Sequence, residues 1–218
     1  MTNPNLTTEI KTHWNKFYKK FNISSESSFS RFVINWLQKN KYNLLKKSLV
    51  DIGCGNSRDA TYFSAKKFNV TGIDLSSTAI KINKKNHTNI DYKTQNICKK
   101  NFTLDNERFD YLYARFFLHA ISLKDESQFL INCKKISKKN SIFLFEFRTT
   151  NDSLMNKGTK LKVNERVYGH YRRFIDVKKF LEKIDTLDFS VLYISQGKSY
   201  ANLKKEHPHI CRMILKRK

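Results

Sequence analysis

The feature that most constrains this chain is the stretch LVDIGCGNSRDATYF, residues 49–63, where an apolar run ends in two glycines and passes into a helical pattern. Gly53 and Gly55 let the backbone approach a ligand closely, and the first N–H groups of the following helix are free to bind it. A dinucleotide-binding loop would need a third glycine where Arg58 stands, because helix and strand pack closely there. The segment therefore predicts a strand, a ligand-binding loop and a helix, and it argues against NAD.

After residue 45, short apolar runs alternate with helical patterns, as in βαβ units whose strands form a parallel sheet. The predicted strands are 48–52, 70–74, 90–94, 109–114 and 141–147, and the predicted helices between them are 58–67, 78–85 and 125–137. Asp176 can cap a further helix, and strands 190–195 and 209–215 suit an antiparallel hairpin at the sheet edge. We predict an α/β fold with a Rossmann-like, mostly parallel sheet and an antiparallel edge strand.

Two further segments flank the sheet. Residues 7–21 and 29–37 carry apolar side chains at helical spacing, which predicts an N-terminal helical cap. Residues 148–175 are polar, contain Gly158 and Gly169, and exceed the usual loop length, so we expect a substrate loop. The length of 218 residues favours one domain, divided into a helical cap (1–45), a ligand-binding core (46–147), the substrate loop (148–175) and a C-terminal helix with edge hairpin (176–218).

Charge bears on the choice of partner. Lys and Arg number 42 against 19 Asp and Glu, and the resulting net charge of +23 would suit a nucleic-acid partner. Most lysines occur in pairs where a predicted helix ends or a loop begins, as on a solvated surface, so nucleic acid is kept as the alternative and not as the favoured partner.

Other patterns narrow the setting. The apolar runs are far shorter than the ~20 residues that span a bilayer, and the N-terminus lacks a basic start followed by an apolar stretch. We therefore expect a cytoplasmic protein with no membrane partner. The four cysteines form no CxxC pair, and Pro208 interrupts the group His207, His209 and Cys211, so we expect no metal.

A second acidic position completes the ligand-binding pattern. Asp74 stands nineteen residues after Gly55, at the end of the second predicted strand, in VTGIDLS. A carboxylate there can accept hydrogen bonds from both hydroxyls of a ribose. Asp51, two residues before Gly53, lies one βα unit away, so both acids should meet at the carboxyl edge of the sheet.

With these residues the chain resembles the class I S-adenosylmethionine (SAM)-dependent methyltransferases over almost its whole length. The resemblance rests on DIGCGNSRD, VTGIDLSSTAI, the QNI segment at 95–97 and FDYLYARFFLHAIS. It implies SAM as cofactor and S-adenosylhomocysteine as product, with Asp51 facing the cationic amino end of the methionine moiety and Asn96 near the adenine. The implied cofactor-binding residues are Trp14, Asp51, Gly53, Gly55, Arg58, Asp74, Leu75, Asn96, Ile97 and Arg115.

Within that family the chain is most similar to small-molecule enzymes such as the thiopurine and tellurite-resistance methyltransferases, which have an N-terminal helical cap with residues like Trp14 and Tyr18. The segments FEFRTTNDSLMNKG and GHYRRFID resemble relatives found among cell-surface polysaccharide genes. The resemblance implies a small-molecule acceptor, such as a surface-polysaccharide precursor.

The acceptor side is rich in arginine. Arg115 and Arg148 follow the fourth and fifth strands, and guanidinium groups there favour a carboxylate or phosphate on the acceptor. An alternative is that Arg172 and Arg173 form a surface pair or bridge to Glu146 and Asp152. The candidate substrate-binding residues are Tyr18, Arg115, Arg148, His170, Tyr171 and Arg172.

Methyl transfer is an in-line displacement that needs positioning and exclusion of water more than it needs a base. His119 and His170 are the candidate catalytic bases, because imidazole titrates near neutral pH. For His119 a role in shaping the pocket is the favoured interpretation.

Two other functions stay open. An RNA cap guanine-N7 methyltransferase, or another nucleic-acid methyltransferase, has a similar glycine loop and would explain the positive charge. A non-catalytic protein that keeps the fold as an interaction platform is the other, although such a protein would not need the ribose carboxylate. The acceptor's identity, the methylated atom, the pathway and the oligomeric state are not indicated by the sequence.

Overall fold

The computed structural model describes residues 4–20, 25–104, 108–201 and 206–218, so Phe21, in the first predicted helix, lies outside the described residues. The strands are β1 (Ser48–Ile52), β2 (Asn69–Asp74), β3 (Asp91–Thr94), β4 (Phe109–Arg115), β5 (Ser137–Arg148), β6 (Thr159–Lys162), β7 (Glu165–Tyr168), β8 (His170–Arg173), β9 (Phe189–Gly197) and β10 (Ile210–Arg217). The helices are α1 (Pro4–Lys20), α2 (Ser28–Lys39), α3 (Arg58–Ala65), α4 (Ser77–Asn86), α5 (Leu123–Lys135) and α6 (Val177–Asp185), with short 3-10 helices η1 (Leu118–Ala120) and η2 (Ser153–Asn156).

A seven-stranded sheet in the order β3-β2-β1-β4-β5-β10-β9 forms the centre of the molecule. The neighbours from β3 to β5 pair in parallel, and β10 runs antiparallel to both β5 and β9. The Rossmann-like sheet and its C-terminal hairpin are confirmed. The antiparallel strand is β10, one place inside the edge strand β9, because β10 completes the hydrogen bonding of β5.

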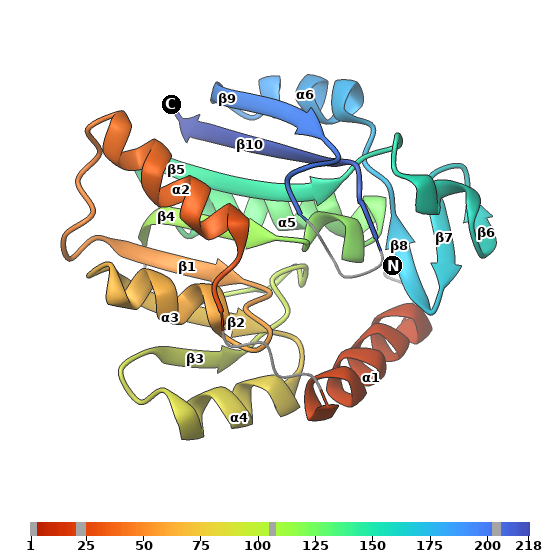
Figure 1. Ribbon diagram of the computed structural model, residues 1–218, viewed down its shortest axis with the longest axis horizontal. Helices are drawn as coiled ribbons and strands as arrows, with labels where there is room; N and C mark the ends of the chain where they lie inside the picture. The colour runs from red at the N-terminus through yellow and green to blue at the C-terminus, as the bar shows by residue number, and fades with distance from the viewer. Residues whose placement is uncertain (1–3, 21–24, 105–107, 202–205) are drawn as a thin grey trace.

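Helices cover both faces of the sheet (Figure 1). On one face Phe129 of α5 and Phe180 of α6 are fully packed into the core. On the other face Phe29 of α2 and Phe63 of α3 are equally buried. The predicted cap therefore divides: α2 is a core helix, capped by Ser27, and α1 alone lies over the carboxyl edge, where it contacts α4 and β8.

The expected substrate loop at 148–175 is wrong in its secondary structure, because residues 159–173 form a small antiparallel sheet of β6, β7 and β8. Gly169, with φ +73°, makes the tight turn between β7 and β8. The polar composition of the segment hides the alternation of the strands. In β8 the side chains of Tyr171 and Arg173 are buried, and those of His170 and Arg172 are half-buried on the other face.

Among the described residues, no helix combines the length and apolar character needed to cross a bilayer.

Candidate functional site

The glycine loop joins β1 to α3 at the carboxyl edge of the sheet. Gly53 and Gly55 both have left-handed backbone angles, with φ of +73° and +51°. The Gly55 N–H donates to Asp74 Oδ2 at 3.0 Å, and the Ser76 N–H donates to Asp74 Oδ1 at 2.7 Å. The Leu75 N–H also hydrogen-bonds to this carboxylate, so the aspartate at the end of β2 fixes the loop after β1.

A cavity of about 380 Å³ opens at this edge. Every residue predicted to bind the cofactor lines it: Trp14, Asp51, Gly53, Gly55, Arg58, Asp74, Leu75, Asn96, Ile97 and Arg115. The candidate bases His119 and His170 line it too, as do Tyr18, Arg148 and Arg172 from the predicted substrate set. The fold thus gathers residues from α1, the ends of five parallel strands and β8 around one space.

Asp51 places a buried carboxyl group at the glycine-loop end of the cavity. Its side chain is buried, and it makes no side-chain hydrogen bond within the described part of the chain. Burial and the nearby carboxylates of Asp59 and Asp74 raise its pKa well above the usual value, against the opposing effect of Arg115 and Arg58. A buried carboxylate in this state fits a cationic group on a ligand.

Helix α1 covers the glycine loop with aromatic side chains. A Cβ atom on Gly55 would lie 2.8 Å from Tyr18 Cζ, so the missing side chain makes room for the tyrosine ring. Trp14 stacks on Tyr18 with ring centroids 5.7 Å apart, and Ser76 Oγ donates to Asn15 Oδ1 at 2.7 Å. Burial and Asp74 raise the pKa of Tyr18 well above 10, so its hydroxyl stays protonated over the loop.

Arg148 is already paired with acidic groups. It donates to Asp152 at 2.9 Å through Nη1 and to Glu206 through Nη2. The sequence suggested that this guanidinium binds an anionic acceptor, but in the structure Asp152 and Glu206 already occupy its hydrogen-bond donors.

The positive group on the acceptor side is Arg172, whose Nη1 donates to the Tyr168 carbonyl at 2.5 Å. Burial and Arg148 lower the pKa of Arg172. An anion bound beside Arg172 would stabilise the charged guanidinium and so counteract both effects on its pKa.

The alternative pairing suggested by the sequence is also wrong. Glu146 lies fully buried between Arg115 and Arg212, at 2.9 and 2.8 Å. Arg173 donates to Glu126 at 2.6 Å and thereby ties the small sheet to α5. Glu146 and Glu126 thus neutralise buried arginines, and Asp152 forms its ion pair with Arg148.

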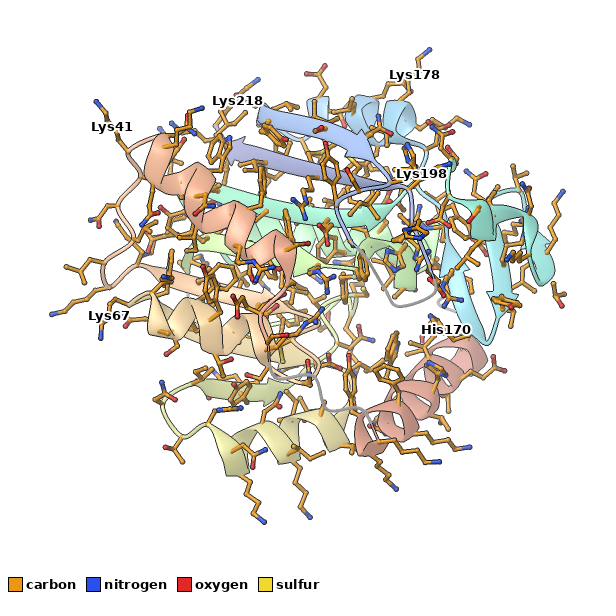
Figure 2. The ribbon with its side chains drawn as sticks, in the orientation of Figure 1. Lys41, Lys67, His170, Lys178, Lys198 and Lys218 are labelled. Atoms are coloured by element: carbon orange, nitrogen blue, oxygen red, sulfur yellow. The ribbon has the colours of Figure 1, made fainter. Side chains whose placement is uncertain are left out.

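Tyr171 does not line the cavity, which corrects its place among the substrate residues. Side chains alternate along a strand, so Tyr171 points away when His170 and Arg172 point in. His170 instead meets α1: its ring centroid lies 4.6 Å from that of His13, a contact that the sequence analysis missed. Figure 2 shows His170 at the end of β8 that faces α1. Burial and Arg172 lower the pKa of His170 to about 3.

His119 is held as a hydrogen-bond donor. The Arg148 N–H donates to His119 Nδ1 at 3.2 Å, which assigns the proton of the neutral imidazole to Nε2. Burial and the positive charge of Arg148 lower its pKa well below the usual value. At neutral pH the ring can therefore donate a hydrogen bond but is poorly suited to accept a proton.

Asp59 is a second group that sequence reasoning missed. Its carboxylate accepts hydrogen bonds from the Ser27 N–H (2.7 Å), Ser27 Oγ (2.8 Å), Ser30 Oγ (2.9 Å) and Tyr113 OH (2.8 Å). The aspartate therefore joins the start of α2, the start of α3 and strand β4 directly beside the cavity. A Ser-rich segment before a helix is a signal for a cap, but it does not show which carboxylate will meet it.

Comparisons with known proteins agree with this geometry. Residues 50–145 match a family model described as a methyltransferase domain. A protein of Invertebrate iridescent virus 6, described as "putative methyltransferase 235L", is 32% identical over 113 residues, which are 50% of this chain and 42% of that protein. The chain therefore matches less than half the length of this curated relative.

Solved structures share the fold at low sequence identity. A SAM-dependent methyltransferase from Methanosarcina mazei has a TM-score of 0.71 at 14% identity, covering 83% of this chain and 96% of that one. A TehB-like enzyme from Corynebacterium glutamicum has a TM-score of 0.63 at 14% identity over 99% and 100% of the two chains.

A third structure was solved with ligands. Phosphoethanolamine N-methyltransferase 1 of Haemonchus contortus, in complex with phosphoethanolamine and S-adenosylhomocysteine, has a TM-score of 0.77 at 16% identity, over 100% of this chain and 50% of that one. The family match and the viral relative are both methyltransferases, and the solved structures share the fold. Residues 50–145 are thus similar to a methyltransferase domain, and the chain shares the fold of the solved SAM-dependent methyltransferases.

Proposed function

We propose that the protein transfers a methyl group from SAM to a small, anionic acceptor held at the Arg172 end of the cavity. The proposal rests on one observation: a single cavity joins the glycine loop, with its two carboxylates, to a pocket lined by Arg172, His119 and His170. Cofactor and acceptor would thus share a space that α1 covers.

The glycine-loop end fits SAM on the chemistry of its groups. Asp51 is a buried carboxylate with a raised pKa and no hydrogen-bond partner of its own in the described residues, which suits the ammonium group of the methionine moiety. Asp74 would accept hydrogen bonds from the ribose hydroxyls, and Leu75, Asn96 and Ile97 would surround the adenine. When bound, SAM supplies a methyl group activated by a sulfonium.

Two arginines complete that end. Arg58 begins α3, lines the cavity and forms no ion pair among the described residues, whereas Arg115 is held by Glu146. Burial and the like charge of Arg115 lower the pKa of Arg58. A carboxylate between the two guanidinium groups would relieve this repulsion, so we assign them the carboxylate of the methionine moiety.

Water exclusion is assigned to α1. Trp14, Phe17 and Tyr18 line the cavity from this helix, and Tyr18 contacts the glycine loop. Closing an apolar cover over a methyl donor favours transfer to the acceptor over side reactions. The lid must open for exchange of cofactor and product, so deletion of α1 should slow turnover as well as weaken SAM binding.

The acceptor is assigned to Arg172, with His119 donating a hydrogen bond to it. Neither histidine is a strong base at neutral pH, because burial lowers the pKa of both. We therefore assign His119 and His170 to positioning the acceptor, and Arg148 to holding Glu206 at the rim. The phosphate of phosphoethanolamine, the ligand of the Haemonchus contortus enzyme, is compatible with an anionic acceptor here.

Membership of the thiopurine and tellurite-resistance branch, and an acceptor drawn from surface-polysaccharide precursors, stay predictions from the sequence. The same holds for a cytoplasmic location.

Nucleic-acid methylation is the competing function, and the net charge of +23 is the observation in its favour. Figure 2 shows labelled lysines on well-separated parts of the molecule, including Lys41 and Lys67 at one end and Lys178 in α6. A nucleic-acid site would need them gathered along one groove. Their spread supports a solvated surface and the small acceptor.

The test is transfer of a labelled methyl group from SAM into a cell extract by the wild-type chain, with Asp74→Ala as the blank. Label in the acid-soluble pool above the blank is the expected result. Label in acid-precipitable, nuclease-sensitive polymer would replace the proposal with the nucleic-acid function. No label in either pool, despite measurable SAM binding, would support a non-catalytic platform.

A further inference from the structure

The small sheet ends in a hairpin tip with an unusual concentration of exposed apolar side chains. Leu161 and Val163 lie at the β6–β7 turn, Val167 follows in β7, and all three side chains are exposed. Val163, at the turn between β6 and β7, is 75% exposed, the highest value among the described large apolar residues. Isolated apolar residues on a surface are ordinary, but a cluster on one projecting element indicates an interaction site.

The tip is held in shape by Arg166. Its guanidinium donates to the carbonyl oxygens of Lys162 at 2.9 Å, Val163 at 3.1 Å and Met155 at 2.7 Å. These hydrogen bonds fix the conformation of the turn. Val163 is therefore held in an exposed position by an ordered structure. Figure 1 shows the sheet of β6, β7 and β8 set apart from the central sheet, on the side where α1 lies.

Charge around the tip is positive. Lys157, Lys160 and Lys162 are exposed beside the apolar residues. Between residues 153 and 172 the sequence has one carboxylate, Glu165, and its side chain is buried. An anionic partner is therefore favoured at this surface, whereas a second copy of a chain with net charge +23 is repelled.

The apolar side chains decide between anionic partners. Leu161, Val163 and Val167 are aliphatic and offer no ring on which a nucleic-acid base could stack. Aliphatic side chains at a tip can enter the acyl boundary of a bilayer, and flanking lysines are attracted to anionic lipids. We propose that the β6–β7 hairpin docks the protein on the surface of a membrane that contains anionic phospholipids.

The hairpin is continuous with strand β8, which lines the cavity. Tyr168 pairs with His170 across the β7–β8 turn, and His170 and Arg172 line the cavity. This peripheral contact differs from a spanning helix, so the lengths of the apolar runs in the sequence could not reveal it. The proposal concerns the hairpin alone and stands whether or not methyl transfer is found.

The test is flotation of the full chain with vesicles of equal parts phosphatidylglycerol and phosphatidylcholine, compared with vesicles of phosphatidylcholine alone. We expect binding to the anionic vesicles, weakened by salt. The double variant Leu161→Ser, Val163→Ser should lower the partition coefficient by roughly tenfold or more. The reason is that it removes the apolar area that two aliphatic side chains would transfer from water to the bilayer. Ile131→Ser, at a 55% exposed position of α5, is the matched control and should bind like wild type.

Several outcomes would overturn the proposal. One is a wild-type chain that stays unbound in the presence of anionic vesicles. Another is a hairpin variant that binds as well as the Ile131→Ser control, which would mean that scattered lysines alone attract the vesicles. A wild-type dimer that the hairpin substitutions convert to a monomer would instead identify the face as an interface between copies. Thermal unfolding of both variants checks that each is folded.

Discussion

Replacing Asp59 by alanine should destabilise the fold more than any surface substitution, because this one buried carboxylate accepts four hydrogen bonds. The bonds come from the N-cap residue Ser27, from Ser30 in the first turn of α2 and from Tyr113 of β4. Removing the carboxylate leaves the donors in place with no charge to satisfy them, while the backbone of α3 can remain helical. The expected consequence is that the N-terminus of α2 loosens beside the cavity.

The magnitude follows from what each donor can do next. Ser30 Oγ also donates to the Ser27 carbonyl at 3.0 Å, and Tyr113 OH lies 3.3 Å from Ser27 Oγ, so these hydroxyls keep a partner. The Ser27 N–H has no other acceptor among the described residues. One buried unsatisfied donor costs about 1–3 kcal/mol, and bonds to a charged acceptor are worth about 1.5–3 kcal/mol each before compensation. We expect a total loss of about 4 kcal/mol for Asp59→Ala.

The assay is denaturant unfolding with the m-value held as a check on two-state behaviour. For a chain of this size about 4 kcal/mol corresponds to a fall in Tm of roughly 10 °C. Asp59→Asn keeps the shape and should lose about half as much, since a carbonyl oxygen still accepts. Asp91→Ala, which removes an exposed partner of Lys93, should leave Tm unchanged. A loss below about 1 kcal/mol for Asp59→Ala would refute the reasoning.

Three further predictions concern the cavity. Arg172→Ala should raise the acceptor's KM by roughly 10–100-fold, the worth of one charge-assisted hydrogen bond, with SAM affinity unchanged; equal loss of both would place the arginine on the cofactor. Gly55→Ala should weaken SAM binding and shift Trp14 fluorescence, because φ of +51° and the overlap with Tyr18 force α1 outward; wild-type affinity and fluorescence would show that the ring contact is not closed. Since burial and Arg172 lower the pKa of His170 to about 3, the unfolded chain binds a proton below pH 6.5 that the folded chain refuses, so stability should fall as the pH drops from 6.5 toward 3. His170→Phe should flatten that fall by up to about 1.4 kcal/mol per pH unit near pH 5, and an unchanged slope in urea titrations would contradict the assignment.

The parts of the fold that the sequence predicted are those governed by local patterns. Apolar runs that end in glycine or aspartate placed β1 and β2, and the helical spacing of Phe129 and Cys133 placed α5. Because parallel strands end at the same edge, Asp51 and Asp74 could be brought together before any coordinates were known. Local pattern and topology were sufficient for the cofactor end of the cavity.

The parts that the sequence did not predict depend on contacts between distant residues. Arg148 was expected to meet an acceptor, but Glu206 reaches it from 58 residues away. The polarity of residues 159–173 concealed a small sheet whose alternation shows only in the burial of Tyr171 and Arg173. Helix α2 has the same spacing as a surface cap, and only the packing of Phe29 against the sheet shows it to be core. In each case the role of a residue depends on what it contacts in the folded chain, and not on the local sequence pattern.

The central claim is that the carboxyl edge of β1 and β2 binds SAM. It is tested most directly by calorimetric titration of S-adenosylhomocysteine into wild type, Asp74→Ala and the control Asp91→Ala, whose exposed carboxylate lies at the start of the neighbouring strand β3. We expect Asp91→Ala to bind like wild type and Asp74→Ala to bind roughly 100-fold or more weakly, because two ribose hydroxyls lose a charged acceptor. Wild-type affinity in a folded Asp74→Ala variant, or no binding by the wild-type chain, would contradict the account.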